Sequence, residues 1–502
     1  MDLPNFLAGD ISFFPTLLLI APLFYVLLKN FVSAGSPSSL PPGPRTWPIV
    51  GNILQMRNMT HVTLTNLAKV HGPLMSLRLG SQLLIVGSSP AAAMEILKTH
   101  DRVFSGRYIM HAVPVKSPEL NHLSLLFASE CNDQWKSLRA IFRTELLSPT
   151  TSESQLELRE KKVREMVGVL GKKEGEVVNL GEIVFATAFN TISNIIFSKD
   201  LTNLERRGAG EEFEELIKRF LELISLPNIS DLYPILGRWD IQGIQKKGLE
   251  IFRRMSTIWN NIVKERRQGK ASRSRDLMDA LSEIGFNNDQ MNQFFLELFM
   301  AGTENTAEIT VWTMAELIKN HEAMDKLHEE LANVVHGNIV RESHLPQLPY
   351  LEACVKETMR LHPPAPFLLA HRNLEACKVM GYDIPKDSQV LVNVWAISRD
   401  PKHWEDALSF KPERFLNSSL DYKGHNFEFL PFGAGRRICP GLPIAARQIP
   451  LLVATLVHLF NWSLPGNMDA AKLDMAEKFA TALKKEQPLY LIPRVRVHGV
   501  NN

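Results

Sequence analysis

The segment Pro431–Gly441 has the sequence PFGAGRRICPG and decides how the rest of the chain is interpreted. Three glycines, two prolines and two arginines surround a single thiol, that of Cys439. Glycines permit a tight loop whose backbone N–H groups point at the sulfur, and such hydrogen bonds stabilise a thiolate and tune a metal bound to it. A dinucleotide-binding loop is excluded, because after Gly433 and Gly435 the third glycine would fall at Ile438. The segment therefore predicts a metal-binding thiolate rather than a structural cysteine.

Upstream of this loop, a stretch without proline from Asn288 to about Asn320 predicts one long core helix, with Asn288 as its N-cap. Near its middle lies Ala301–Thr306 (AGTENT), where small residues allow another group to approach the backbone closely. Glu304 places an acid inside a mostly apolar helix, which is costly unless the acid has a purpose. Taken alone, the segment is equally compatible with a helix-packing site.

The composition excludes several classes of protein. Of 502 residues, 45% are hydrophobic and 22% are charged, which is typical of a globular chain. The 56 Lys and Arg against 54 Asp and Glu give a formal net charge of +2, which argues against nucleic-acid binding. Four cysteines cannot form a disulfide framework, and the absence of CxxC and HExxH motifs argues against a zinc site.

The N-terminal residues predict a membrane anchor. Ile11–Leu28 contains no charged side chain and would form a helix of about 27 Å, enough to cross a thin bilayer. Asp2 and Asp10 occupy the region where a cleaved signal peptide is positively charged, so we expect an uncleaved anchor with the remaining chain in the cytosol. The alternative is a buried apolar helix. The stiff run Pro41–Pro44 predicts either a hinge that orients the following domain on the membrane or a plain linker.

We therefore expect three parts, namely an anchor at residues 1–30, a linker with a proline-rich hinge at 31–51, and one catalytic domain at 52–502. Helical patterns dominate that domain, as in 156–170 and 211–223. Strand-like runs are few and short, at residues 74–79, 83–86, 390–394 and 489–492. The expected fold class is mainly α with a minor β-sheet part.

These motifs resemble those of the cytochrome P-450 superfamily, in spacing and in order. In the thiolate loop the matching residues are Phe432, Gly435, Arg437, Cys439 and Gly441. Elsewhere they are Trp135 and Arg139 (WxxxR), Glu357–Arg360 (ExxR) and Pro412–Phe415 (PERF). Residues 98–102, 415–419 and 440–445 are similar to plant microsomal members, above all to the alkaloid-oxidising group that contains N-methylcoclaurine 3′-hydroxylase and littorine mutase.

The resemblance implies the cytochrome P-450 fold and a haem b cofactor whose iron is bound by the Cys439 thiolate. A thiolate ligand pushes electron density toward the iron and favours O–O cleavage. Phe432, Gly435 and Gly441 would complete the loop beside the haem. Basic and aromatic side chains would contact the haem propionates, namely Trp135, Arg139, Arg372 and Arg437. A buried ion-pair network with a structural role is expected from Glu357, Arg360 and Arg414.

In the resemblance, Ala301–Thr306 is the oxygen-activating helix segment, and Glu304 would help to deliver protons. Most members carry threonine at the next position, where this chain has Asn305 followed by Thr306. Two explanations remain open. Either Thr306 replaces the missing hydroxyl, or the reaction depends less on ordinary oxygen insertion, so that a substrate radical rearranges or couples.

By family position, substrate contacts would come from residues 107–115, 367–369 and 479–481, whose mainly apolar side chains imply a hydrophobic small molecule. The expected function is oxidation of an alkaloid by hydroxylation, phenol coupling or littorine-mutase-like rearrangement. The alternatives are a terpenoid hydroxylase, a haem-thiolate isomerase that needs no reductase, and a haem-binding sensor or carrier. Expected partners are NADPH-cytochrome reductase, O2 and the lipid of the endoplasmic reticulum membrane, with the catalytic domain on its cytoplasmic face, and no nucleic acid.

Overall fold

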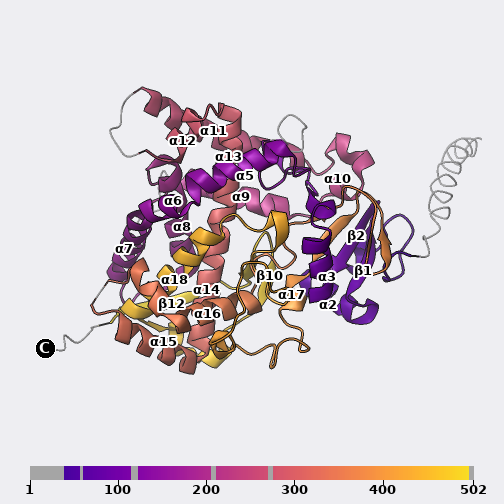
Figure 1. Cartoon of the computed structure of the whole chain (residues 1–502). Coiled ribbons are helices and arrows are strands. Elements are labelled where there is room, and N and C mark those ends of the chain that lie inside the picture. The colour runs from indigo at the N-terminus through magenta and orange to yellow at the C-terminus, as the bar shows by residue number, and fades with distance from the viewer. Residues whose placement is uncertain are drawn as a thin grey trace, which may run out of the picture.

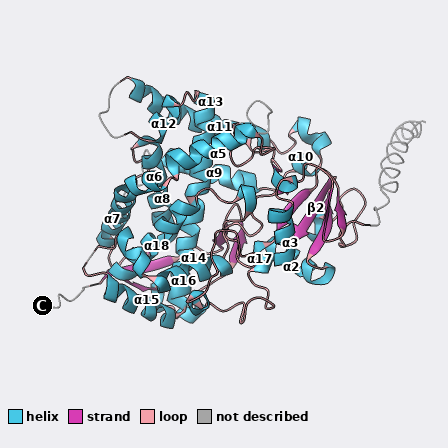
Figure 2. Cartoon of the chain, viewed as in Figure 1, coloured by secondary structure: helices cyan, strands magenta, loops and turns pink. Residues whose placement is uncertain are grey.

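The computed structural model describes residues 39–56, 60–114, 123–204, 211–268, 275–337 and 339–496. The expected anchor at residues 1–30 lies outside these residues. Helices dominate the described chain, and short strands gather in a few small sheets (Figure 2). The prediction of a mainly α fold with a minor β part is therefore confirmed.

Most helices lie on the side of the molecule away from β1 and β2 (Figure 1). Their buried apolar side chains form one large core. The longer helices are α2 (Thr60–His71), α5 (Asp133–Leu146), α7 (Leu156–Lys172), α8 (Leu180–Phe197), α9 (Glu211–Ser225), α11 (Ile244–Arg267), α13 (Asn288–Gly302), α14 (Glu304–Lys319), α15 (His321–Val334), α16 (Pro349–Leu361) and α18 (Leu442–Leu459). The shorter helices are α3 (Pro90–Met94), α6 (Pro149–Ser154), α10 (Ile229–Leu232), α12 (Leu277–Glu283) and α17 (Val394–Ile397).

The largest sheet has five strands in the order β1-β2-β8-β5-β3 and lies at one end of the molecule (Figure 1). Its strands are β1 (Leu74–Leu79), β2 (Gln82–Gly87), β8 (Gln389–Val392), β5 (His371–Arg372) and β3 (Gly106–Arg107). A second sheet contains β4 (Val178–Asn179), β12 (Tyr490–Val495) and β9 (Phe460–Ser463). Two hairpins complete the set, β6 (Cys377–Val379) with β7 (Tyr382–Ile384) and β10 (Glu477–Phe479) with β11 (Leu483–Lys485). Each strand-like run of the sequence overlaps a strand of the structure.

The central helix differs from the prediction in two respects. It is divided into α13 and α14 at Thr303, instead of running unbroken to Asn320. The Thr303 hydroxyl donates to the carbonyl of Phe299 over 2.6 Å, a back-bond that bends helices. The N-cap is Asn287 rather than Asn288, because the Asn287 side chain accepts the N–H of Gln290 in a capping box. Asn288 is instead the first residue of the helix.

Aromatic side chains fasten α13 to the helices around it. The ring of Phe299 lies 4.9 Å from that of Phe189 in α8 and 4.8 Å from that of Phe213 in α9, between centroids. Trp259 of α11 stacks on Phe299 at an interplanar angle of 8°. All four side chains are buried. The middle of the long helical stretch therefore lies in the core, as the sequence predicts.

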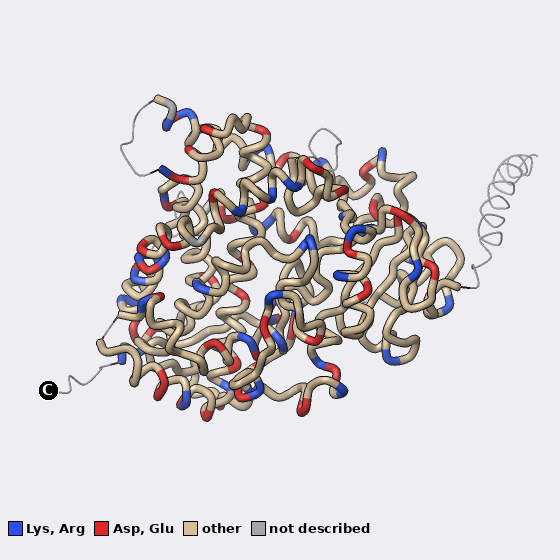
Figure 3. The backbone as a smooth tube through the Cα atoms, viewed as in Figure 1, with Lys and Arg blue, Asp and Glu red and all other residues tan. Residues whose placement is uncertain are grey.

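Two helices, α8 and α18, are long and apolar enough to cross a membrane by length and composition. In the part of the chain that the structure describes, 78% of the α8 window and 67% of the α18 window are buried inside the protein. Both are thus core helices, and they pack against α14. Basic and acidic residues are interspersed along the whole described chain (Figure 3).

Candidate active site

The loop around Cys439 takes a shape that depends on glycine. Gly433 and Gly435 have φ values of +70° and +69°, a conformation that glycine adopts without strain. A Cβ atom on Gly435 would lie 2.1 Å from the carbonyl oxygen of Leu97, so no side chain fits there. The Cys439 N–H donates to the carbonyl of Phe432 over 2.9 Å and closes the loop. Gly435 is therefore required both for its backbone conformation and because no larger side chain fits there, whereas Gly433 is required mainly for its backbone conformation.

The Cys439 sulfur receives hydrogen bonds from the backbone. The N–H groups of Gly441 and Leu442, where α18 begins, donate to it, and the Arg139 guanidinium adds positive charge nearby. Burial raises the pKa of the Cys439 thiol, these three groups lower it, and the net shift is upward. The backbone thus prepares the sulfur for a negative charge, and a bound metal cation would make the thiolate the stable form.

Two half-buried arginines lie beside Trp135, and their charges act on the buried Arg107. The guanidinium carbons of Arg437 and Arg139 lie 4.8 Å and 5.9 Å from the indole centroid. Burial lowers the pKa of Arg437 to about 10, and burial together with the charge of Arg437 lowers the pKa of Arg107 well below its usual value. Among the described residues, no carboxylate forms an ion pair with any of the three. We call Arg107, Arg139 and Arg437 the arginine cluster.

Backbone carbonyls hold the arginine cluster in place without neutralising it. Arg437 donates to the carbonyls of Ser105, Leu125 and Ala128 over 2.7–3.1 Å. Arg139 donates to the carbonyl of Ile438, directly before Cys439, over 2.7 Å. Since buried cations require an anionic partner, the cluster is suited to a ligand that carries carboxylates.

Arg372 has a different environment from the arginine cluster. It lies on β5, and its Nη1 forms an ion pair with Asp387 over 3.2 Å. In the sheet, Arg372 is opposite Gly106, whereas Arg107 is opposite His371. The structure thus brings Trp135, Arg139 and Arg437 together, and it adds Arg107, which the sequence placed only among the substrate-contacting residues.

The Glu357, Arg360 and Arg414 side chains form one network, as expected from the resemblance. Arg360 donates twice to the Glu357 carboxylate, over 2.7 and 2.8 Å, and Arg414 Nε donates to the same carboxylate over 3.0 Å. Arg360 also donates to the carbonyls of Ser398 and Ala407, each over 2.7 Å. Both Glu357 and Arg360 are fully buried. Every charge here has a partner, which distinguishes this network from the arginine cluster.

One face of the central helices is left uncovered. Ala301 is exposed, and Asn305 and Glu308 are half-buried, although the residues between them are mostly buried. At 3.6 residues per turn these three lie along one stripe. The Asn305 amide donates to the carbonyl of Ala301 over 3.1 Å, whereas Thr306 is buried and donates to the carbonyl one turn earlier. The open stripe therefore carries Asn305 and not Thr306.

Glu304 forms an ion pair that the sequence did not predict. Its buried carboxylate contacts Nζ of Lys484 on β11. Burial lowers the pKa of Lys484, but the Glu304 charge outweighs it and the net shift is upward. The pKa of Glu308 is raised to about 7, mainly by burial and also by Glu304, while Lys484 acts in the opposite direction. Lys484 thus lies between two carboxylates of α14.

The expected substrate-contacting stretches lie close to one another. The rings of Phe367 and Phe479 are 5.6 Å apart, and Leu369 and Phe479 are 39% and 37% exposed although both are large apolar side chains. The Thr481 hydroxyl donates to the carbonyl of Leu221 in α9 over 2.8 Å. Residues 115–122 lie outside the described chain, so the expected substrate-contacting stretch at residues 107–115 is described only to residue 114.

The fold is mainly helical, the Cys439 sulfur accepts hydrogen bonds from backbone amides, and the arginine cluster has no carboxylate partner within the described part of the chain. These features together are those expected of a haem-thiolate protein. A family model described as Cytochrome P450 matches residues 41–492, so the chain belongs to the cytochrome P450 family. A "Probable (S)-N-methylcoclaurine 3′-hydroxylase isozyme 2" of Coptis japonica is 48% identical over 96% of this chain and 99% of that protein. Corytuberine synthase of Coptis japonica is 45% identical over 91% of this chain and 94% of that protein. A zebra fish cytochrome P450 solved with abiraterone has a TM-score of 0.71 and 25% identity, over 87% of this chain and 100% of that one.

Membership of this family makes the chain a haem-thiolate monooxygenase with haem b as cofactor. Three observations on the described residues fit that group. The Cys439 sulfur has backbone amide donors, the arginine cluster lacks the carboxylates that two propionates would supply, and Ala301 on the central helix is exposed.

Three residues of this region were not found from the sequence, namely Arg107 as a cluster member, Glu308 and Lys484. Glu308 is one helical turn beyond Glu304 and could have been found by that spacing. The other two meet their partners through strand pairing and loop packing, for which the sequence has no local signal.

Proposed function

We propose that this protein oxidises an alkaloid of the benzylisoquinoline type, using O2 and electrons delivered by NADPH-cytochrome reductase. The family supplies the general reaction, and two relatives above 40% identity over nearly the whole chain are named for alkaloid chemistry. The observation that carries the proposal in this chain is the amide-cradled Cys439 together with the open stripe at Ala301. The apolar Phe367, Leu369 and Phe479 side chains would bind the aromatic rings of such a substrate.

Each part of the site would have one task. The haem, when bound, supplies the oxygen and redox chemistry. Cys439 would hold the iron, and the arginine cluster and Trp135 would hold the propionates. Glu304 would help to deliver protons next to the open stripe, with Lys484 keeping its carboxylate in position. Glu357, Arg360 and Arg414 would support the loop from behind and do no chemistry.

A second candidate reaction, coupling or rearrangement instead of hydroxylation, is favoured by Asn305. The stripe carries an amide where most members of the family have a hydroxyl, and the Thr306 hydroxyl is engaged on another face. A site without that hydroxyl would relay protons less readily, so a substrate radical would have more time to couple or rearrange. We propose that Asn305 shifts the product in this direction.

We further propose that the protein is bound to the endoplasmic reticulum membrane by residues 1–30, with residues 52–502 as the catalytic domain on the cytoplasmic face. The hinge between them is not a free linker. Ser76 of β1 donates its N–H to the carbonyl of Pro42 over 2.9 Å and its hydroxyl to that of Pro41 over 2.6 Å. A Cβ on Gly43 would lie 1.9 Å from the Ser76 carbonyl oxygen, so glycine is required for this contact. A hinge held in this way would orient the domain relative to the anchor.

The proposed function is tested with the full chain and a plant NADPH-cytochrome reductase in microsomes. Benzylisoquinolines, including (S)-N-methylcoclaurine, and monoterpenoids are screened for a spin-state shift and for NADPH-dependent products. We expect products only from alkaloids, and none from the Cys439→Ser variant. Conversion of monoterpenoids alone would establish the terpenoid hydroxylase, conversion without NADPH the isomerase, and an intact carbon-monoxide spectrum without any turnover the sensor or carrier.

The role of Asn305 is tested by Asn305→Thr with the substrate found in that screen. The restored hydroxyl is expected to raise the ratio of hydroxylated to coupled or rearranged product by about 10-fold, less than the roughly 10²- to 10⁴-fold of a complete general acid–base contribution. An unchanged product ratio would show that Asn305 is a silent replacement.

A further inference from the structure

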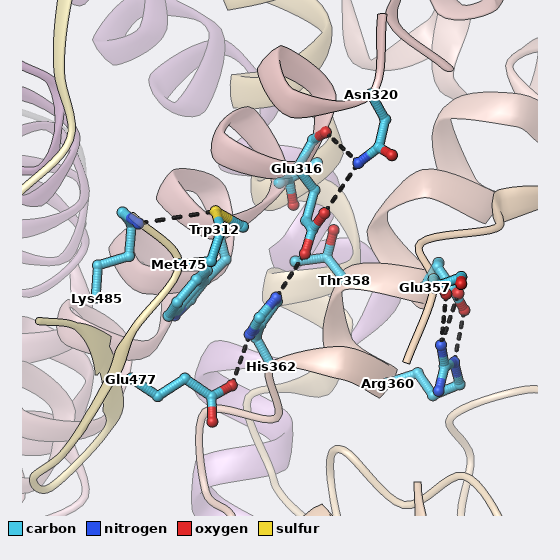
Figure 4. A network of polar contacts seen from close by, with 12 residues as sticks. Trp312, Glu316, Asn320, Glu357, Thr358, Arg360, His362, Met475, Glu477 and Lys485 are labelled. Atoms are coloured by element: carbon cyan, nitrogen blue, oxygen red, sulfur yellow. Dashed lines mark hydrogen bonds and ion pairs between the residues drawn. The ribbon is translucent and has the colours of Figure 1, made fainter. Parts of the chain in front are cut away.

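A buried polar network centred on His362 lies next to the Glu357–Arg360 network but is separate from it (Figure 4). His362 follows α16, two residues beyond Arg360. Its Nδ1 lies 2.7 Å from Oε1 of Glu477 on β10, and its Nε2 lies 2.8 Å from Oε1 of Glu316 on α14. Ionised carboxylates only accept hydrogen bonds, so both contacts form when the imidazole carries a proton on each nitrogen. His362 therefore joins the two carboxylates through both of its ring nitrogens.

The ring of Trp312 provides a second support for His362. The indole and the imidazole are stacked, with centroids 3.8 Å apart and an interplanar angle of 3°. An imidazolium ion over an indole face is a favourable cation–π arrangement. Trp312 Nε1 also donates to the carbonyl of Leu483 on β11 over 3.0 Å. Trp312 thus contacts both the histidine and the second strand of the hairpin.

Glu477 is the point where the network meets the hairpin β10–β11. Besides His362, its carboxylate accepts from Arg399 and from the Trp395 indole, each over 2.8 Å, and lies 3.2 Å from His61 Nε2. Burial raises the pKa of Glu477, but the histidine hydrogen bonds and the Arg399 charge outweigh it and hold that pKa well below its usual range. The charges of Glu316, Glu477, Arg399 and a protonated His362 add to zero.

The same hairpin carries the groups that face the active site. Glu477 is paired with Lys485 across the ladder, Lys478 with Lys484, and Phe479 with Leu483. Lys484 contacts Glu304, and Phe479 packs against Phe367. The hairpin is therefore attached at three places along α14. Lys484 contacts Glu304, the Leu483 carbonyl accepts from Trp312, and Glu477 is linked to Glu316 through His362.

We propose that His362 is a positioning residue for the reaction, which acts by clamping the hairpin β10–β11 to α14. It touches neither substrate nor haem, and it acts through Glu477 on the placement of Phe479 and Lys484. Loss of the clamp frees the hairpin, which weakens substrate binding while Cys439 and the Glu357–Arg360 network remain intact. The effect on substrate binding rests on the proposed function, whereas the attachment of the hairpin does not.

The alternative is that the network only contributes stability, as any buried ion pair does. A matched control exists in the pair of Arg159 on α7 with Glu342. Both side chains are buried, Arg159 Nη2 donates to Glu342 Oε2 over 2.9 Å, and neither belongs to the hairpin. Glu342→Gln weakens a buried ion pair of the same kind at another place.

The test compares hydrogen–deuterium exchange of the haem-loaded wild type with Glu477→Gln, His362→Phe and the control Glu342→Gln. His362→Phe keeps the ring on Trp312 but removes both hydrogen bonds, and Glu477→Gln serves if that variant does not fold. Peptides covering residues 474–486 are expected to exchange about 10- to 100-fold faster in the first two variants and unchanged in the control, because charged hydrogen bonds are lost there. For the substrate from the screen, KM rises with kcat less affected, and the carbon-monoxide spectrum is retained.

The proposal is overturned if the hairpin peptides exchange as in the wild type, or if Glu342→Gln accelerates them equally. It is also overturned if kcat falls and KM does not change. If the screen yields no substrate, the proposed function fails, and the exchange data still decide whether His362 clamps the hairpin.

Discussion

At the scale of single residues, the burial of the charged Arg107 side chain without an anionic partner in the part of the chain that the structure describes requires an explanation. It is almost fully buried on β3, its Nη1 donates to the carbonyl of Leu369 over 2.8 Å, and its Nε has no hydrogen-bond partner among the described residues. Besides burial, the positive charges of Arg437 and Arg139 lower the pKa of its guanidinium. Without an anionic ligand this residue destabilises the fold, and with one it binds that ligand.

This reasoning predicts opposite effects of Arg107→Met on the two forms of the protein. We expect the haem-free protein to become more stable, because a repelling cation is removed from a buried place, and the haem-loaded protein to lose haem about 10-fold faster. The measurements are the melting temperature of both forms and the rate of haem transfer to apomyoglobin. Arg266→Met is the control, since Arg266 is a partly buried arginine with Asp276 as its own partner and lies outside the predicted haem site. Destabilisation of both forms by Arg107→Met would contradict this assignment.

The site residues that could be proposed from the sequence are those with a local signal. Cys439 was recognisable because its glycines and arginines are its neighbours in the chain, and Glu357 with Arg360 because they are one helical turn apart. Lys484 and His362 have no such signal. Each meets its partner only after the hairpin has paired in one register and packed on α14, and that register is decided by tertiary contacts.

At the scale of elements, the division between α13 and α14 is the feature that the sequence missed. Helical periodicity and the lack of proline predicted a single helix, since neither reports the hydroxyl back-bond of Thr303. Directly before the division, a Cβ on Gly302 would lie 2.8 Å from Cδ1 of Ile192 in α8. The close approach of α8 and the bend of the central helix therefore occur at one place.

We predict that Gly302→Ala destabilises the protein by about 1–2 kcal/mol, because overpacking against Ile192 exceeds the gain in helix propensity. The additional change Ile192→Val removes Cδ1 and should restore most of the loss. A double-mutant cycle of unfolding free energies in urea measures this coupling. Additive effects of the two substitutions would show that Gly302 is not held by Ile192.

At the scale of the whole molecule, large exposed apolar side chains occur on two segments that are distant in the sequence but in contact in the structure. Trp47 is 59% exposed in the hinge, and Ile235 and Trp239 are 81% and 67% exposed between α10 and α11. The segments are joined where the Tyr233 hydroxyl donates to the carbonyl of Ile49 over 3.2 Å. Exposed apolar groups of this size indicate contact with another apolar phase, which, given the anchor proposed for residues 1–30, would be the bilayer.

We therefore predict that a protein lacking residues 1–30 still binds vesicles of endoplasmic reticulum lipids, only more weakly. Replacing Trp239 and Ile235 by glutamate in that truncated protein should abolish flotation with the vesicles, because charged side chains do not enter the apolar phase. Leu408→Glu is the matched control, since Leu408 is 77% exposed elsewhere on the surface. Equal loss of flotation in both would attribute the effect to charge alone.

The fold of the molecule was more predictable than its site. Helix content, the few strands and the buried middle of the central helix follow from hydrophobic periodicity along the chain. The arginine cluster is defined by buried charges without a partner in the described chain, and the His362 network by buried charges that have partners. These pairings follow only from the packed structure, so the sequence does not predict them.

The hairpin β10–β11 is attached to α14 through both of its strands, and residues 479–481 at its tip belong to the stretches proposed to contact substrate. A redesign that keeps Glu477, Lys484 and Lys485 and replaces residues 478–483 with those of relatives that accept other molecules would alter selectivity while the thiolate loop and the Glu304–Lys484 ion pair stay unchanged. The same separation gives natural variation a place to act, because duplicated copies of this chain can diverge in the tip while the oxygen chemistry stays in working order.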